Sequence, residues 1–167
     1  LGSVLRCLES PPLGGDTLFS DSHAAYDNLP EAVREKVEGR FARHDFEGFR
    51  NRLRARGIGE EEIEAFDKNY PNPEHPVIRT HPETGRKGIY VNAAFTKHII
   101  GMDQADSDAL LGVLYQQAGL PEYQCRFRWA NNSIAFWDNR ASQHYAVSDY
   151  WPPHRTVTSR TMMTTPN

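Results

Sequence analysis

His144 is the residue whose surroundings most strongly suggest chemistry. It lies in a predicted strand, residues 143–147, that follows the sequence Trp-Asp-Asn-Arg at 137–140. A neutral imidazole can ligate a metal ion, whereas a protonated ring cannot. A lone strand histidine is more often a hydrogen-bonded core residue, because a metal site needs several convergent ligands. Taken by itself, His144 leaves both interpretations open.

Three motifs in a fixed order along the chain are more specific than this histidine alone. They are Gly-Gly-Asp-Thr-Leu at 14–18, His-Pro-Glu-Thr-Gly at 81–85 with Tyr-Val-Asn at 90–92, and Trp-Asp-Asn-Arg at 137–140 with Gln-His-Tyr at 143–145. The set resembles the taurine dioxygenase family of iron(II)- and 2-oxoglutarate-dependent dioxygenases. The similarity extends from near Leu1 to about Arg160, and several ordered motifs are stronger evidence than one.

This resemblance implies a facial triad, His-x-Asp/Glu and a distal histidine, which leaves three metal positions open for 2-oxoglutarate and O₂. His144 matches the distal histidine and is the expected metal ligand and catalytic residue. The chain contains no His-x-Asp or His-x-Glu. His44 and Asp45 are adjacent, so on a strand they point to opposite faces and cannot clamp one ion. We therefore expect the other two ligands in a further N-terminal region, ahead of Leu1. The present chain alone should not bind iron with native geometry and should be inactive.

The resemblance also implies groups that bind the cosubstrate. Thr17 matches a threonine that helps to hold a carboxylate of 2-oxoglutarate, and its hydroxyl can donate one hydrogen bond. Arg155 and Arg160 match two arginines of the family, and a planar guanidinium suits a carboxylate. Here they are five residues apart, one more than in the family, so a regular strand would place them on opposite faces unless a bulge intervenes. We expect Arg160 to bind the distal carboxylate, with Arg155 as its neighbour.

Phe95 matches an aromatic residue that lines the family's substrate pocket, although core packing explains an aromatic side chain equally well. Residues 137–140 are interpreted as a structural turn that aims His144 at the metal. The remaining histidines lie in loops, caps or surface contexts and are not expected to be ligands; they are His23, His75, His81, His98 and His154.

The elements that must position these residues are mostly short strands. Alternating or apolar runs predict strands at 3–8, 16–19, 77–80, 88–91, 124–129, 133–137, 143–147 and 156–163. Helices are predicted at 30–38 and at 107–117, the latter capped by Ser107. Residues 47–70, rich in arginine and glutamate, predict short helices in a surface excursion, either a lid or a solvated connection. These patterns favour an α+β chain with an antiparallel β core and helices outside.

The family resemblance refines this to a double-stranded β-helix (jelly roll) core with flanking helices, incomplete at the N-terminus. Residues 1–167 would be the C-terminal portion of a single dioxygenase catalytic domain. The formal net charge of -3, with interleaved acids and bases, provides no bulk electrostatic reason to bind nucleic acid or a membrane. No apolar run approaches the roughly 20 residues that span a bilayer. The two cysteines form no metal-binding pair by spacing, and a reducing, cytoplasmic location is expected.

The expected function is hydroxylation of a small organic substrate with release of succinate and CO₂. Iron(II) is the cofactor, and 2-oxoglutarate and O₂ are the cosubstrates. The substrate classes that the resemblance implies are taurine, other sulfonates, alkyl sulfates and aryloxyalkanoates. A homo-oligomer is left open. The alternative from another class is a metal-free jelly-roll binding or interaction module, which an upstream sequence without His-x-Asp would support.

Overall fold

The computed structural model describes residues 2–150 and 157–163 of the chain. The chain divides into two compact units. The first comprises Leu1–Asn28, Thr80–Gly88 and Ala118–Asn167, and the second comprises Leu29–Arg79 and Ile89–Gln117. The first unit contains both His144 and Thr17, so its sheets position most of the expected site.

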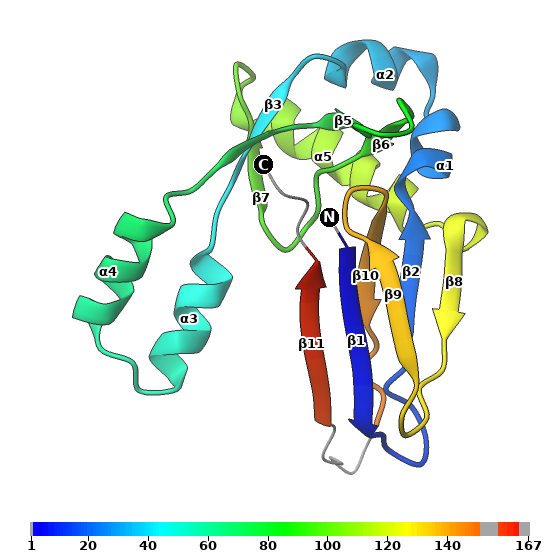
Figure 1. Ribbon diagram of the computed structural model, residues 1–167. Helices are drawn as coiled ribbons and strands as arrows, with labels where there is room; N and C mark the ends of the chain where they lie inside the picture. Colours follow the sequence, from blue (N-terminus) through cyan, green and yellow to red (C-terminus); the bar gives the residue numbers. More distant parts are fainter. Residues whose placement is uncertain (1, 151–156, 164–167) are drawn as a thin grey trace. The chain divides into compact units, whose positions relative to one another are not determined.

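Two three-stranded antiparallel sheets build the first unit (Figure 1). One has the order β11-β1-β9, with β1 at Gly2–Glu9, β9 at Ile134–Asp138 and β11 at Val157–Met163. The other has the order β10-β2-β8, with β2 at Thr17–Asp21, β8 at Gln124–Phe127 and β10 at Ser142–Ala146. Each strand predicted in this part of the sequence forms, although β8 ends two residues before the predicted end.

The side chains between these two sheets form the core of the first unit. Cys7 of β1 is buried, with 3% of its surface exposed. The Trp137 ring of β9 lies 5.2 Å from the rings of both Phe19 and His144, which belong to the other sheet. Because side chains alternate along a strand, these contacts identify the inner face of each sheet. Phe136, next to Trp137, points to the outer face and is 67% exposed.

The pairing of β1 with β11 contains one irregularity. Cys7 lies opposite Thr158, but the next pair joins Glu9 to Val157, so β1 has one residue more than β11 at this point. The bulge is therefore on β1, and β11 is paired in continuous register along its length. Arg155 lies outside the described residues, so whether the two candidate arginines lie on opposite faces stays a prediction.

Short connections complete the first unit. α1, at Ser22–Asp27, follows β2 directly and is capped by Asp21, which accepts hydrogen bonds from the backbone of His23 and Ala24. No pattern in the sequence predicts this six-residue helix. A turn precedes β9, with Asn132 in the left-handed region at φ 70°. The 3₁₀ helix η1, at Pro121–Tyr123, leads into β8.

The second unit combines helices with an antiparallel sheet of its own, in the order β4-β3-β7. Its strands are β3 at Phe41–His44, β4 at Glu74–Pro76 and β7 at Thr96–Ile99. Its helices are α2 at Glu31–Val37, α3 at Glu47–Ala55, α4 at Glu60–Asn69 and α5 at Gln104–Ala118. The strands predicted at 77–80 and 88–91 form a two-stranded sheet, β5 at Ile78–Thr80 and β6 at Lys87–Ile89, of which Thr80–Gly88 is assigned to the first unit.

The surface excursion predicted at residues 47–70 folds as the two helices α3 and α4. Arg50 on α3 pairs with Asp67 on α4 at 3.1 Å and with Asp45 at 2.6 Å. The Phe66 ring of α4 lies 5.1 Å from the Phe49 ring of α3, so apolar contact accompanies the ion pairs. These contacts hold the two helices together. Whether the pair covers a substrate stays a prediction.

The prediction that Ser107 caps the long helix is wrong. α5 begins three residues earlier, at Gln104, and the Asp103 carboxylate accepts the backbone N–H of Asp106 at 2.9 Å. The Ser107 side chain is fully buried and accepts a hydrogen bond from the backbone of Ile99. Asp103 is the better cap because its carboxylate also interacts favourably with the positive end of the helix dipole.

His44 serves the core of the second unit. It is 6% exposed, and its Nε2 lies 3.0 Å from the Thr96 hydroxyl. Burial, together with the nearby His75 ring, lowers the pKa of His44 to about 4, so its ring is neutral at neutral pH. Asp45 accepts a hydrogen bond from the Arg50 guanidinium at 2.6 Å. Among residues 2–150 and 157–163, no helix is long and apolar enough to cross a membrane.

Candidate functional site

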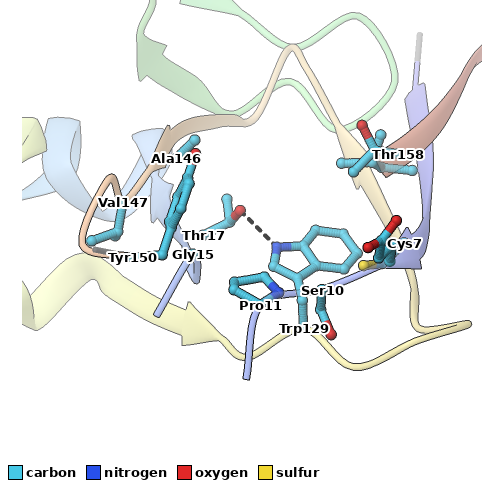
Figure 2. A pocket seen from close by; sticks show the side chains of 12 residues that line it. Cys7, Ser10, Pro11, Gly15, Thr17, Trp129, Ala146, Val147, Tyr150 and Thr158 are labelled. Carbon is cyan, nitrogen blue, oxygen red and sulfur yellow. Dashed lines mark hydrogen bonds between the residues drawn. The ribbon is translucent and has the colours of Figure 1, made fainter. Parts of the chain in front are cut away.

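A pocket of about 230 Å³ opens between the two sheets of the first unit. Figure 2 shows its lining, which combines strand residues with a rim of loop residues. The lining residues are Leu5, Cys7, Glu9, Ser10, Pro11, Gly15, Thr17, Trp129, Ala146, Val147, Tyr150 and Thr158. The pocket is thus built from segments that are more than 100 residues apart in the sequence.

Thr17 lies at the base of this pocket, on the central strand of its sheet. Its neighbours across the strands are Ala146 of β10 and Phe127 of β8. The side chain is 7% exposed, and its hydroxyl accepts a hydrogen bond from the Trp129 indole at 2.9 Å. A hydrogen bond from a buried polar group to one oxygen of an anion in the pocket is electrostatically stronger than the same bond in water.

His144 lies on the same face of β10 as Ala146, which lines the pocket. Two positions along a strand span roughly 7 Å, about the length of a five-carbon diacid. His144 pairs with Phe19 across the strands, and the Trp137 ring packs beside it at 5.2 Å. The side chain itself is exposed among the described residues. The structure therefore brings His144 and the pocket around Thr17 together on one sheet.

The turn between β9 and β10 is tightly cross-linked. Asp138 accepts hydrogen bonds from the backbone of Arg140 at 2.8 Å and from its guanidinium at 2.8 and 3.1 Å. The backbone carbonyl of Asp138 accepts the Ser142 hydroxyl at 2.7 Å. Hydrogen bonds from Arg140 hold the pKa of the Asp138 carboxyl well below its usual range. The motif at 137–140 therefore fixes the start of the strand that carries His144.

His81 is a contributor to this turn that sequence reasoning missed. It is 5% exposed, and its Nε2 lies 3.0 Å from the Asp138 carboxylate. Its Nδ1 accepts the backbone N–H groups of Glu83 and Thr84, so the proton is assigned to Nε2, which donates to Asp138. The only sequence feature that pointed to His81 was its position at the start of the motif His-Pro-Glu-Thr-Gly at 81–85. Its partner is 57 residues away, which no local pattern identifies.

The pocket rim is held by an ion-pair network. Arg126 reaches Asp16 at 2.6 Å and Asp149 at 3.2 Å, and Asp149 accepts the backbone N–H of Gly15 at 2.7 Å. Gly14 has a φ of 78°, and a Cβ there would lie 2.6 Å from the Asp149 carboxylate. The Gly-Gly pair is therefore needed for the loop to turn and to pass so close to Asp149.

Of the two candidate arginines, Arg160 lies on a described strand. The backbone of Arg160 lies on β11 opposite Leu5, which lines the pocket, and two positions from Thr158, which also lines it. Arg155 lies outside the described residues. Phe95 belongs to the second unit, where it is 37% exposed and its ring makes an edge contact with Phe46 at 6.0 Å.

The residues that the structure describes do not complete a metal site. Within 2–150 and 157–163, no three histidine, cysteine, aspartate or glutamate side chains converge to hold a metal ion. Of the expected facial triad, only the position assigned to His144 falls within these residues, since the His-x-Asp or His-x-Glu pair is expected ahead of Leu1. The fit of iron to this part of the protein is therefore limited to a single ligand.

Comparison with known proteins gives a consistent result. The model of the family described as taurine catabolism dioxygenase TauD, TfdA matches residues 1–164. An alkylsulfatase of Acinetobacter baylyi is 36% identical over 163 residues, covering 93% of this chain and 50% of that protein. An alpha-ketoglutarate-dependent sulfate ester dioxygenase of Pseudomonas putida is also 36% identical, covering 93% of this chain and 52% of that protein.

Solved structures match as well. A putative alpha-ketoglutarate-dependent 2,4-D dioxygenase from Burkholderia xenovorans superposes with a TM-score of 0.81 at 30% identity. The match covers 95% of this chain and 60% of that one. The present chain thus spans about half the length of the curated relatives it matches.

Proposed function

This chain belongs to the TauD, TfdA family of dioxygenases, and from that premise we propose that the complete protein is an iron(II)- and 2-oxoglutarate-dependent dioxygenase. It would hydroxylate a small organic substrate. The observation that carries the proposal is the placement of Thr17 and His144 on one face of one sheet, beside a pocket of suitable size. A cosubstrate that reaches from a metal at His144 to a hydroxyl at Thr17 fits this spacing.

The proposed reaction consumes one 2-oxoglutarate and one O₂ for each C–H bond oxidised. One oxygen atom enters the substrate as a hydroxyl, and the other enters the new carboxylate of succinate as CO₂ leaves. If the hydroxylated carbon bears a sulfate ester, it collapses to an aldehyde and sulfate; a sulfonate would release sulfite. The substrate classes we propose are those implied by the family: taurine, other sulfonates, alkyl sulfates and aryloxyalkanoates. The metal supplies the oxidation, and the protein supplies binding and orientation.

The residues of this chain would have separate roles in that reaction. His144 would supply one neutral imidazole ligand, held in place by the cross-linked turn at 138–142. Thr17 and one of the two arginines would bind the distal carboxylate of 2-oxoglutarate, and Phe95 would contact the primary substrate. The other two metal ligands would come from a His-x-Asp or His-x-Glu ahead of Leu1.

We propose further that the two facing sheets of the first unit are part of a double-stranded β-helix. Their antiparallel order and the side chains packed between them support this assignment. The free thiols Cys7 and Cys125 are compatible with the proposed cytoplasmic location. The oligomeric state is open.

The second candidate is a metal-free binding module with the same fold. The described residues contain no three-ligand metal group, which is compatible with this candidate and equally with two ligands supplied ahead of Leu1. Such a module would bind small anions in the pocket without consuming 2-oxoglutarate.

A substrate panel tests the proposed function and separates it from the second candidate. The complete protein, with iron(II), 2-oxoglutarate and O₂, would be given an alkyl sulfate, a sulfonate such as taurine, or an aryloxyalkanoate. We expect at least one class to be consumed in a one-to-one ratio with succinate formed. The metal-free module would be favoured if the protein bound 2-oxoglutarate but formed no succinate, both in the presence of each substrate class and in the absence of any primary substrate.

A further inference from the structure

The direction of the Thr17 O–H bond decides whether this hydroxyl can donate a hydrogen bond to a ligand in the pocket. Thr17 lies at the base of the pocket, and the proposed function assigns its hydroxyl to a carboxylate of 2-oxoglutarate. A threonine hydroxyl is one donor and two acceptor sites on a rotating bond. If its proton pointed elsewhere, the oxygen would present lone pairs to the carboxylate and repel it.

Trp129 constrains this hydroxyl. Its indole N–H lies 2.9 Å from Thr17 Oγ1, and Figure 2 shows the contact as a dashed line at the pocket wall. The indole N–H is a donor and cannot accept, so Thr17 Oγ1 must accept this bond. The hydroxyl proton is thereby excluded from the side of Thr17 that faces the indole.

The indole is also held in place. Trp129 follows β8 by two residues, and its ring packs edge-on against Phe127 with 4.7 Å between centroids. Phe127 in turn lies opposite Thr17 in the register of β2 and β8. Within the described residues, the indole is the one hydrogen-bond partner of the Thr17 hydroxyl. The hydroxyl proton therefore remains available for a ligand in the pocket.

We infer that Trp129 is a positioning residue: its indole N–H occupies one lone pair of Thr17 Oγ1 and leaves the hydroxyl proton directed at an anionic group in the pocket. This inference rests on the proposed function, which identifies that anion as a carboxylate of 2-oxoglutarate. Trp129 acts through Thr17, although its ring also lines the pocket.

Trp129→Phe is the sharpest variant, because it keeps an aromatic ring against Phe127 and removes the N–H. Without the indole N–H, the Thr17 hydroxyl loses its fixed direction. We expect this to cost about as much binding free energy as one neutral hydrogen bond, which corresponds to cosubstrate binding about fivefold weaker. The measurement is calorimetric titration of N-oxalylglycine, a non-reacting analogue of 2-oxoglutarate, into the complete protein loaded with Mn(II). In turnover assays the KM for 2-oxoglutarate should rise, while the KM for the primary substrate stays unchanged.

A double-mutant cycle with Thr17→Val separates positioning from general structure. Valine matches the shape of threonine but has no hydroxyl to orient. In the Thr17→Val background, Trp129→Phe should therefore cause no further loss of N-oxalylglycine affinity. An equal loss in both backgrounds, or no loss in either, would overturn the inference.

The same titration distinguishes this inference from the proposed function. If the unmodified Mn(II)-loaded protein does not bind N-oxalylglycine, the proposed function itself fails. If it binds and the cycle shows no coupling between Thr17 and Trp129, the proposed function stands and the positioning role is wrong. Thermal unfolding of each variant confirms that the affinities compare folded proteins.

Discussion

Replacement of His144 by alanine is expected to abolish iron binding and 2-oxoglutarate turnover in the complete protein while leaving it folded. His144 would be one of three protein ligands, and losing a ligand should cost more than the roughly 10–100-fold that loss of an outer partner of a ligand costs. The fold should survive because the His144 side chain is exposed. The measurements are iron stoichiometry after dialysis and succinate production under saturating 2-oxoglutarate.

Tyr145→Ala is the matched control for this variant. Tyr145 is the next residue on β10, points to the opposite face and is 64% exposed. We expect it to keep iron and turnover close to the unmodified values. If His144→Ala retained full iron stoichiometry and an unchanged rate of succinate formation, His144 could not be the distal ligand.

Removal of the arginine that binds the distal carboxylate should raise the 2-oxoglutarate requirement by two to four decades. Breaking a buried ion pair costs about 3–5 kcal/mol, and each tenfold change in affinity corresponds to about 1.4 kcal/mol. We expect this arginine to be Arg160, because its backbone lies on β11 opposite Leu5 of β1, which lines the pocket. Arg155→Ala should have a small effect if the strand continues without a bulge. The test is titration of 2-oxoglutarate under saturating iron and O₂.

Two further variants sharpen this comparison. Arg160→Lys should rescue only part of the loss, because an ammonium group cannot copy the two parallel hydrogen bonds of a guanidinium. Arg128→Ala removes an exposed arginine beyond the end of β8 and should leave the titration unchanged. A dominant effect at Arg155 would mean that Arg155, and not Arg160, contacts the carboxylate, so that the one residue by which this chain exceeds the family's spacing follows the contact. Small effects at both positions would mean that another group holds it.

The strands of the first unit could be predicted because alternation is a local property. Residues 124–127 alternate polar and apolar side chains in the sequence, and this segment forms β8. The burial of β8 does not follow the alternation, since the apolar Cys125 is exposed. The start of α5 could not be fixed in the same way, since Asp103 and Ser107 are both good capping residues. The choice depends on Ile99, whose backbone N–H takes up the Ser107 hydroxyl.

The candidate site shows the same division. The motifs indicated Thr17 and His144; Thr17 lines the pocket, and His144 lies two positions from the lining residue Ala146 on β10. The residues that support them were not predicted: Trp129 is 112 residues from Thr17, and His81 is 57 residues from Asp138. Contacts over such separations depend on how the sheets pack, and no periodicity in a single sequence encodes them.

The most direct test of the account is peptide mapping of the native protein by mass spectrometry, directed at the residues that precede Leu1. We predict a peptide that continues through Leu1 and Gly2 and that lies in a region containing His-x-Asp or His-x-Glu, the two ligands that would join His144. A native protein whose mature chain begins at Leu1, or whose preceding region lacks both motifs, would contradict the assignment of this chain to an iron-dependent dioxygenase.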